Sequence, residues 1–125
     1  MDDILISIII PAYGARETIS KTLASLRGQD YDGPREIIVV NSSQDETAEM
    51  IRHGFPEVKV VQLEKRVFTG EAKNIGLERA RGKIIAFIDS DCVAEKTGFQ
   101  SWSKGTGRAI KLSAVLSEIQ ILITW

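Results

Sequence analysis

Cysteine is almost absent from this sequence, since Cys92 is the single one among 125 residues. One thiol cannot form a disulfide within the chain, and disulfides are the usual mark of oxidising compartments. Cys92 also has no cationic residue beside it that would stabilise a thiolate, so we expect an unreactive thiol. The scarcity of cysteine therefore favours a reducing compartment, and we expect a cytoplasmic location.

An excess of either charge is also missing, because 16 basic residues stand against 17 acidic ones and leave a net charge of −1. This balance offers no electrostatic basis for binding nucleic acid or an anionic membrane surface, and we expect neither partner.

Long hydrophobic runs are absent too. The first apolar run stops at Pro11, and the apolar residues 109–125 are interrupted by Lys111 and Glu118. Both are shorter than the roughly 20 residues that cross a bilayer as a helix, so we expect no membrane span.

What the sequence does contain is an alternation of short apolar runs and segments with helical spacing. The first and fourth runs lack strict polar alternation, which is typical of strands covered on both faces. The alternation predicts right-handed crossovers and an α/β fold, with a mainly parallel, Rossmann-like sheet flanked by helices. The expected strands are residues 4–10, 36–40, 58–63 and 83–88, and the expected helices are residues 15–29, 45–53 and 69–81.

Residues that commonly begin and end helices support these bounds. Asp45 stands at the start of the second expected helix, Thr69 is expected to cap the third, and Gly82 is expected to terminate it. The pattern is lost after residue 95. We therefore expect one ordered α/β domain over residues 1–95 and an irregular tail over residues 96–125, whose last part, 109–125, fits helix or strand equally well.

The fourth apolar run ends abruptly in two carboxylates, Asp89 and Asp91, with Ser90 between them. Ligand sites of open α/β sheets lie beyond the carboxyl ends of the strands, and alternate residues of a strand project in the same sense. Two carboxylates without an adjacent basic residue suit a hard divalent cation that carries phosphate oxygens. The simpler alternative is a pair of polar residues that close a strand before a turn.

Taken together, these segments resemble the nucleotide-binding half of glycosyltransferase family 2, the inverting GT-A type. Each motif alone is common, and the resemblance rests on their order and spacing over about residues 6–92. The matching segments are residues 7–13 with a Pro-x-Tyr turn, residues 19–29 with Leu-x-x-Leu spacing, residues 36–47 with an acidic loop, residues 70–76 with the sequence GEAKNIG, and Asp89-Ser90-Asp91 as the Asp-x-Asp motif.

The resemblance implies transfer of a sugar from a nucleotide-diphosphate donor to an acceptor hydroxyl, with Mg²⁺ or Mn²⁺ on the diphosphate. It assigns the metal to Asp91, while Asp89 would order the shell of the metal or contact the ribose. Tyr13 would lie against the base. The donor-binding residues that it implies are Pro11, Tyr13, Asn41, Lys73, Asn74 and Asp89.

Three positions depart from the family pattern. Asn41 stands in place of an aspartate and can donate as well as accept hydrogen bonds, so base selectivity does not carry over. Lys73 replaces an arginine and lacks its planar fork, and Gly14 replaces an asparagine. Simpler roles remain open: Asn41 in a loop that caps the next helix, Lys73 as a solvated helix residue, and Tyr13 in turn packing.

The family pattern also includes a second half with the acceptor site and a catalytic carboxylate, and no counterpart is recognisable after Cys92. Glu118 is the one acid beyond Glu95, and the residues around it do not match the acidic motif that holds the family's catalytic base. Loss of a general base typically lowers a rate by about 10²–10⁴. We therefore expect an apparently truncated chain that alone binds its donor weakly and transfers sugar poorly or not at all. Its catalytic residue is unknown, and we expect self-association through residues 109–125. The alternative function is a non-catalytic nucleotide or nucleotide-sugar binding module.

Two other classes of site with acids at strand ends fit less well. A receiver-like or phosphatase-like Mg²⁺ site needs an aspartate at the end of the first strand, where Pro11 follows Ile10. A sugar nucleotidyltransferase needs a glycine-rich basic loop at the same place. The sequence there, Pro11-Ala12-Tyr13-Gly14, is not one.

Overall fold

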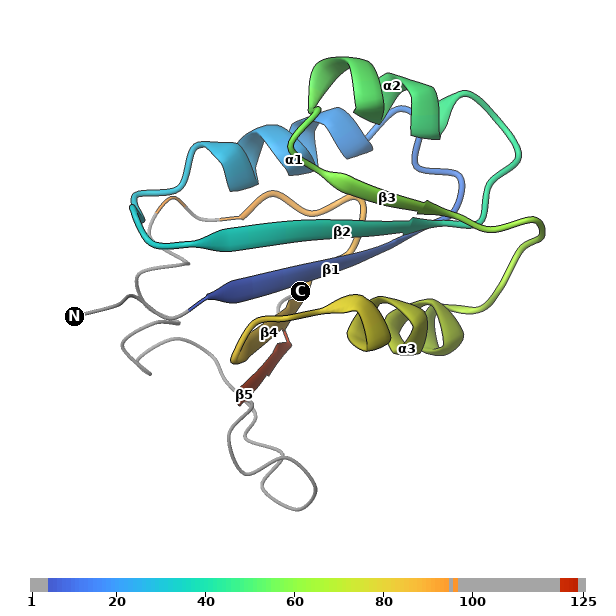
Figure 1. Ribbon diagram of the computed structural model, residues 1–125. Coiled ribbons are helices and arrows are strands. Elements are labelled where there is room, and N and C mark those ends of the chain that lie inside the picture. The colour runs from blue at the N-terminus through green and yellow to red at the C-terminus, as the bar shows by residue number, and fades with distance from the viewer. Residues whose placement is uncertain (1–4, 95, 97–119, 124–125) are drawn as a thin grey trace.

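The computed structural model describes residues 5–94, 96 and 120–123 of the chain (Figure 1). Its strands and helices alternate over residues 6–87. In order they are β1 (Ile6–Ala12), α1 (Ile19–Arg27), β2 (Arg35–Asn41), α2 (Thr47–Gly54), β3 (Lys59–Gln62), α3 (Thr69–Arg79), β4 (Ile84–Phe87) and β5 (Gln120–Ile123).

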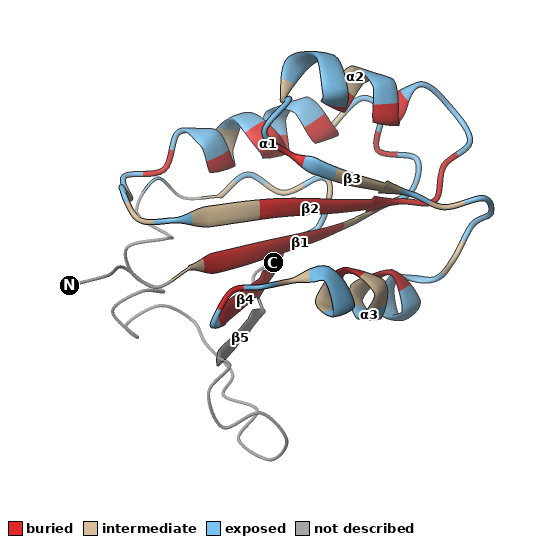
Figure 2. Cartoon of the chain, in the orientation of Figure 1, coloured by how far each residue is buried: buried red, intermediate tan, exposed pale blue. Residues whose placement is uncertain are grey.

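The strands form one sheet in the order β3-β2-β1-β4-β5, and every neighbouring pair is parallel. Helices α1 and α2 lie on one face of this sheet and α3 lies on the other (Figure 1). Because β1 is flanked on both sides and covered on both faces, its side chains are almost completely buried (Figure 2). The expected α/β fold with a parallel, helix-flanked sheet is confirmed.

The core is divided between the two faces by the alternation of side chains along each strand. Ile8 and Ile10 of β1 belong to the cluster that also contains Leu23 of α1. Ile9, between them, belongs to a cluster on the other face, where Leu77 of α3 packs. A strand of consecutive isoleucines is therefore explained by burial on two sides rather than one.

Several predicted bounds were wrong by a few residues. Helix α1 begins at Ile19 and not at residue 15, because the amides of Thr18 and Ile19 both donate to the Ala15 carbonyl and form a turn. Strand β1 continues through Pro11, which pairs with Val40 of β2. A proline is tolerated there because the pairing of β1 with β4 has already ended at Ile9.

The predicted start of the third helix at residue 69 is confirmed, but its predicted cap and its predicted end were wrong. Thr69 is the first residue of α3, Phe68 precedes it with extended backbone, and no side chain caps the helix. The helix ends at Arg79, so Gly82 does not terminate it. Helix α2 begins at Thr47, two residues after the predicted start, and the Asp45 carboxylate just before it accepts a hydrogen bond from the Thr47 amide at 3.0 Å.

A partly buried polar network ties the amino ends of the strands together. The Ser7 hydroxyl is fully buried, donates to the Glu36 carboxylate at 2.6 Å and accepts from the Gly82 amide at 2.8 Å. Glu36 also accepts from the Arg81 amide at 2.6 Å and from the Lys59 ammonium at 2.7 Å. This network joins β1, β2, β3 and the turn that leads into β4.

We expect Glu36→Gln to destabilise the fold in a pH-dependent way. Burial acts to raise the pKa of Glu36, but the hydrogen bonds from Lys59, Ser7 and Arg81 outweigh it and hold the pKa below its ordinary value of 4.5. A carboxylate with a lowered pKa stabilises the folded state above its unfolded pKa, and this stabilisation is lost as the pH falls through the folded pKa. The variant should lose about 1–3 kcal/mol at pH 7.

Urea denaturation of both proteins at several pH values measures this effect. The difference in the free energy of unfolding should narrow as the pH falls below 4.5, where the wild-type carboxyl takes up its proton. A difference of the same size at every pH would show that the charge of Glu36 has no part in the network.

Residues 120–123 resolve one open question about the tail, because they form the strand β5 parallel to β4. The rest of the tail, residues 97–119 with 124–125, lies outside the described residues, and so does most of the segment 109–125 for which we predicted self-association. Within the described part of the chain, no helix has the length and apolar character needed to cross a membrane.

Candidate functional site

A cavity of about 530 Å³ opens at the carboxyl end of the sheet. It lies beyond the ends of β1 and β4, with residues of α3 and of the loop before it also on its lining, as expected for parallel α/β sheets. The residues that line it are Pro11, Ala12, Tyr13, Gly14, Ala15, Thr18, Ser42, Arg66, Val67, Thr69, Ala72, Asp89, Ser90 and Asp91.

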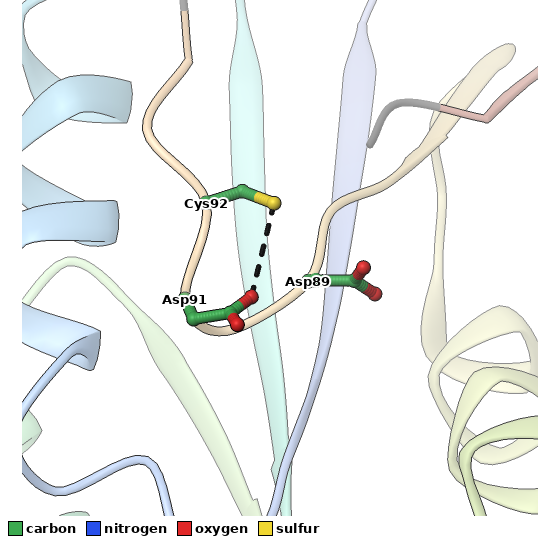
Figure 3. A group of neighbouring side chains, drawn as sticks. All are labelled: Asp89, Asp91 and Cys92. Carbon is green, nitrogen blue, oxygen red and sulfur yellow. Dashed lines mark hydrogen bonds between the residues drawn. The ribbon is translucent and has the colours of Figure 1, made fainter.

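The two predicted carboxylates, Asp89 and Asp91, both line this cavity and both are exposed. With Cys92 they offer three ligand atoms that lie within 4.8 Å of one another (Figure 3). The carboxylates are not brought together by strand alternation as expected, because β4 ends at Phe87. Instead the Cys92 amide donates to the Asp89 carbonyl at 3.1 Å and closes a turn that holds both acids on one side.

The donor set of this turn fits a hard divalent cation. Two carboxylates supply the oxygen ligands that Mg²⁺ and Mn²⁺ prefer. Burial and the neighbouring charges of Asp89 and Asp91 raise the pKa of Cys92, so its sulfur is a neutral thiol at neutral pH. Its contact with the Asp91 carboxylate at 3.8 Å is that of a weak S–H donor. Cys92 therefore offers a poor ligand while protonated, which leaves the two carboxylates as the groups that could hold a cation.

The predicted residues at the end of β1 also line the cavity. Pro11 is half-buried and Tyr13 is 53% exposed, so the Tyr13 ring is available to a ligand. Gly14 has a φ of +65°, a conformation that side chains disfavour, and its amide donates to the Ser43 hydroxyl at 2.7 Å. The glycine that departs from the family pattern therefore forms the sharp turn that follows Tyr13.

Asn41 is not among the residues that line the cavity, and its side chain is fully buried. Its amide nitrogen donates to the Gln62 side chain at 2.8 Å, and its amide oxygen accepts from the Ser43 amide at 3.3 Å. The Gln62 amide nitrogen in turn donates to the Ser43 carbonyl at 2.9 Å. These bonds link the ends of β2 and β3 to the Ser42–Ser43 loop, and a donor contact by Asn41 stays a prediction.

Lys73 and Asn74 of α3 are likewise absent from the cavity lining. The Lys73 ammonium lies 5.4 Å from the centroid of the Phe87 ring, within the range of a cation–π contact, and Asn74 is exposed. The structure thus gives Lys73 a packing partner at the end of β4. Contact of either residue with a donor remains a prediction.

Arg66 is a cavity residue that sequence reasoning missed. Its guanidinium carbon lies 4.1 Å from the centroid of the Tyr13 ring and 6.0 Å from that of Phe68, which is 81% exposed. It adds a cation to a cavity whose described acids are Asp89 and Asp91. Arg66 follows Glu64 and Lys65 in a loop without periodicity, so no sequence signal separates it from a solvated charged run.

A parallel α/β sheet with a cavity beyond its strand ends is the architecture of the Rossmann-like class of α/β domains, which bind their ligands at this edge of the sheet. Comparison with known proteins identifies the family. The profile of Glycosyl transferase family 2 matches residues 7–101. Glycosyltransferase AglE of Haloferax volcanii is 35% identical over 92 residues, which are 70% of this chain and 30% of that protein.

Solved structures agree with this match. S. aureus TarS 1-349 in complex with UDP-GlcNAc superposes with a TM-score of 0.73 at 30% identity, over 83% of this chain and 30% of that one. The mannosyltransferase PcManGT of Pyrobaculum calidifontis, in complex with GDP-Man and Mn²⁺, gives a TM-score of 0.63 at 27% identity, over 73% of this chain and 29% of that one.

The chain belongs to glycosyl transferase family 2, and the resemblance inferred from its motifs is confirmed. Its sheet and flanking helices match the GT-A fold of the solved neighbours. The chain spans about a third of the length of the curated relatives it matches, at 30% for AglE and 36% for the Escherichia coli glucosyltransferase WfgD.

Proposed function

We propose that this chain binds a nucleotide-diphosphate sugar in the cavity at the carboxyl end of its sheet, as the donor-binding part of a metal-dependent, inverting glycosyltransferase. The observation that carries the proposal is the turn that places Asp89 and Asp91 together on that cavity. The complexes of TarS with UDP-GlcNAc and of PcManGT with GDP-Man support a nucleotide sugar as the ligand class.

A divalent cation, Mg²⁺ or Mn²⁺, is the cofactor we propose for Asp91 and Asp89. When bound, it offsets the negative charge of the donor diphosphate and of the leaving group. Without a cation, two exposed carboxylates would repel that diphosphate, because like charges a few ångströms apart interact unfavourably. Metal-dependent donor binding is therefore the behaviour that this pair of acids favours.

We assign the other cavity residues to contacts with the base or with the phosphates of the donor. Tyr13 is 53% exposed and offers its ring to a base, and Pro11 shapes the adjacent wall. Arg66, stacked on Tyr13, offers a planar cation within reach of the same ligand. Asn41, Lys73 and Asn74 are proposed as donor contacts on the family pattern alone, and each would have to turn toward the ligand from the position described above.

The reaction is a displacement at the anomeric carbon of the sugar. A bond forms between the acceptor oxygen and that carbon while the bond from the carbon to the diphosphate oxygen breaks. The nucleoside diphosphate leaves with the bonding electron pair, and the configuration inverts. The acceptor proton must pass to a base, and we assign that role to none of the described residues.

A non-catalytic donor-binding module is the second candidate. One observation favours it: among the described residues that line the cavity, the carboxylates are Asp89 and Asp91, which the proposal already commits to the cation. A module of this kind would bind nucleoside diphosphates without transferring or hydrolysing the sugar. Assays of donor hydrolysis and of sugar transfer separate the two candidates, since turnover supports the enzyme and binding without turnover supports the module.

Calorimetry with UDP, GDP and dTDP, each with and without Mn²⁺, tests the proposed function. We expect at least one nucleoside diphosphate to bind in the presence of Mn²⁺ and to bind at least tenfold more weakly without it, as an interaction through the carboxylate pair requires. UMP and GMP serve as matched controls, because they lack the second phosphate. Equal binding of a diphosphate with and without the metal would refute the proposed site.

A further inference from the structure

Helix α1 carries a polar stripe beside the apolar one that packs on the sheet. Its apolar residues Ile19, Leu23 and Leu26 are buried in the core. Thr18, at the start of the helix, and Thr22 and Ser25 within it follow at spacings of four and three residues, which place them along one side of a helix. Thr22 is only 1% exposed, so this polar side chain is as buried as the core.

The partner of this stripe is the carbonyl of Ser90, the residue between the two cavity aspartates. The Thr22 hydroxyl donates to the Ser90 oxygen at 2.9 Å, and the Thr18 hydroxyl donates to the same oxygen at 3.0 Å. Two donors on one carbonyl use both of its lone pairs. The backbone at the centre of the Asp89–Asp91 turn is therefore held by two hydroxyls from one side of α1.

Both hydroxyls have a weaker alternative within their own helix. The Thr22 hydroxyl oxygen also lies 3.4 Å from the Thr18 carbonyl oxygen, and the Thr18 hydroxyl oxygen lies 3.3 Å from the Ala15 carbonyl oxygen. A hydroxyl has a single proton to donate, and the shorter distances favour the Ser90 carbonyl. The hydroxyls thus serve the turn rather than the helix.

The same side of α1 continues to hold the chain after the turn. The Ser25 hydroxyl donates to the Thr22 carbonyl at 2.7 Å and accepts from the Ala94 amide at 2.9 Å. Farther on, the Asp30 amide donates to the Lys96 carbonyl at 2.9 Å. Figure 1 shows the segment that follows β4 running along α1, which agrees with these contacts.

We propose that Thr22, together with Thr18 and Ser25, is a positioning residue that sets the separation of the Asp89 and Asp91 carboxylates for a divalent cation. This inference rests on the proposed function. None of the three hydroxyls is needed as a metal ligand, because each of them bonds backbone atoms of the turn or of the segment after it. Groups that orient metal ligands typically change metal affinity by about 10–100-fold when they are removed.

Thr22→Val removes the hydroxyl and keeps the shape of the side chain, and Thr22→Ser keeps the hydroxyl. Thr47→Val is the matched control, since Thr47 is also fully buried but lies at the start of α2, outside the cavity lining. For each protein we would measure, by calorimetry, the ratio of the Kd without Mn²⁺ to the Kd with Mn²⁺, using UDP and in parallel GDP. Circular dichroism and thermal unfolding would show that each variant is folded.

We expect Thr22→Val to lower this ratio about tenfold with little change in the metal-free Kd, and we expect both Thr22→Ser and Thr47→Val to keep the wild-type ratio. A general loss of stability would not change the ratio selectively. The positioning role would be overturned if folded Thr22→Val protein kept the wild-type ratio of Kd values. It would also be overturned if Thr47→Val lowered that ratio as much as Thr22→Val does. Either result would leave the proposed function standing. A wild-type chain without any metal dependence would refute both.

Discussion

Asp91→Asn is expected to remove the metal dependence of nucleoside diphosphate binding. The substitution keeps the size of the side chain but replaces a charged ligand with a neutral amide, one half of which is a donor that cannot bind a cation. Asp89 alone then faces the cation, and a single exposed carboxylate binds Mn²⁺ weakly. We expect the gain in affinity that Mn²⁺ produces to fall by at least tenfold, toward no gain at all.

The measurement is calorimetric titration of the diphosphate that binds wild-type protein, with and without Mn²⁺. Asp32→Asn provides the matched control, because it makes the same chemical change at an exposed residue in the loop before β2, at the opposite end of the sheet from the cavity. This control should keep the full metal dependence. Tight metal-free binding that survives Asp91→Asn would show that the diphosphate binds elsewhere.

Gly82→Ala should have the largest effect on stability. A Cβ atom at this position would lie 2.6 Å from the Ser7 hydroxyl oxygen, 2.7 Å from the Leu5 carbonyl oxygen and 2.8 Å from the Ser7 amide nitrogen. Two of these neighbours are backbone atoms of the chain at the start of β1, which cannot move aside as a flexible side chain can. Relief of the overlap would shift β4 from β1 and break the bond from the Gly82 amide to Ser7.

We expect a loss of about 3 kcal/mol in the free energy of unfolding, from overpacking together with the lost hydrogen bond. Urea denaturation measures it. Gly54→Ala is the matched control, because a Cβ atom there has no neighbour within 4 Å and Gly54 is the last residue of α2. The control should be neutral or slightly stabilising, since alanine favours helix over glycine. Equal stability of the two variants would contradict the packing role of Gly82.

The contacts of α1 connect stability and function in this domain. The apolar stripe of α1 holds the helix on the sheet, and its polar stripe holds the turn that carries Asp89 and Asp91. A substitution on the polar stripe should therefore alter metal binding before it unfolds the chain. A substitution on the apolar stripe, such as one at Leu23, should unfold the chain before it alters metal binding.

Much of the fold could be predicted because buried parallel strands leave a simple signal. The isoleucine run of β1 and the alternation of apolar and helical segments indicate a two-sided sheet with crossover helices. The bounds were harder to predict, since they depend on contacts made in three dimensions. Pro11 stays in β1 because β2 pairs with it, and Gly82 is needed for packing against Ser7 rather than for ending a helix.

The candidate site, like the fold, could be predicted from the sequence only in part. The order and spacing of the motifs by themselves determined the family, the parallel sheet and the acid pair Asp89 and Asp91. Each of these features depends on residues that are close together in the sequence. Only the tertiary structure decided that a turn, and not strand alternation, brings the carboxylates together, that Arg66 stacks on Tyr13 and that Asn41 is buried. The physical reason is that such contacts join residues from separate elements, whose distances are set by the packing of helices on the sheet.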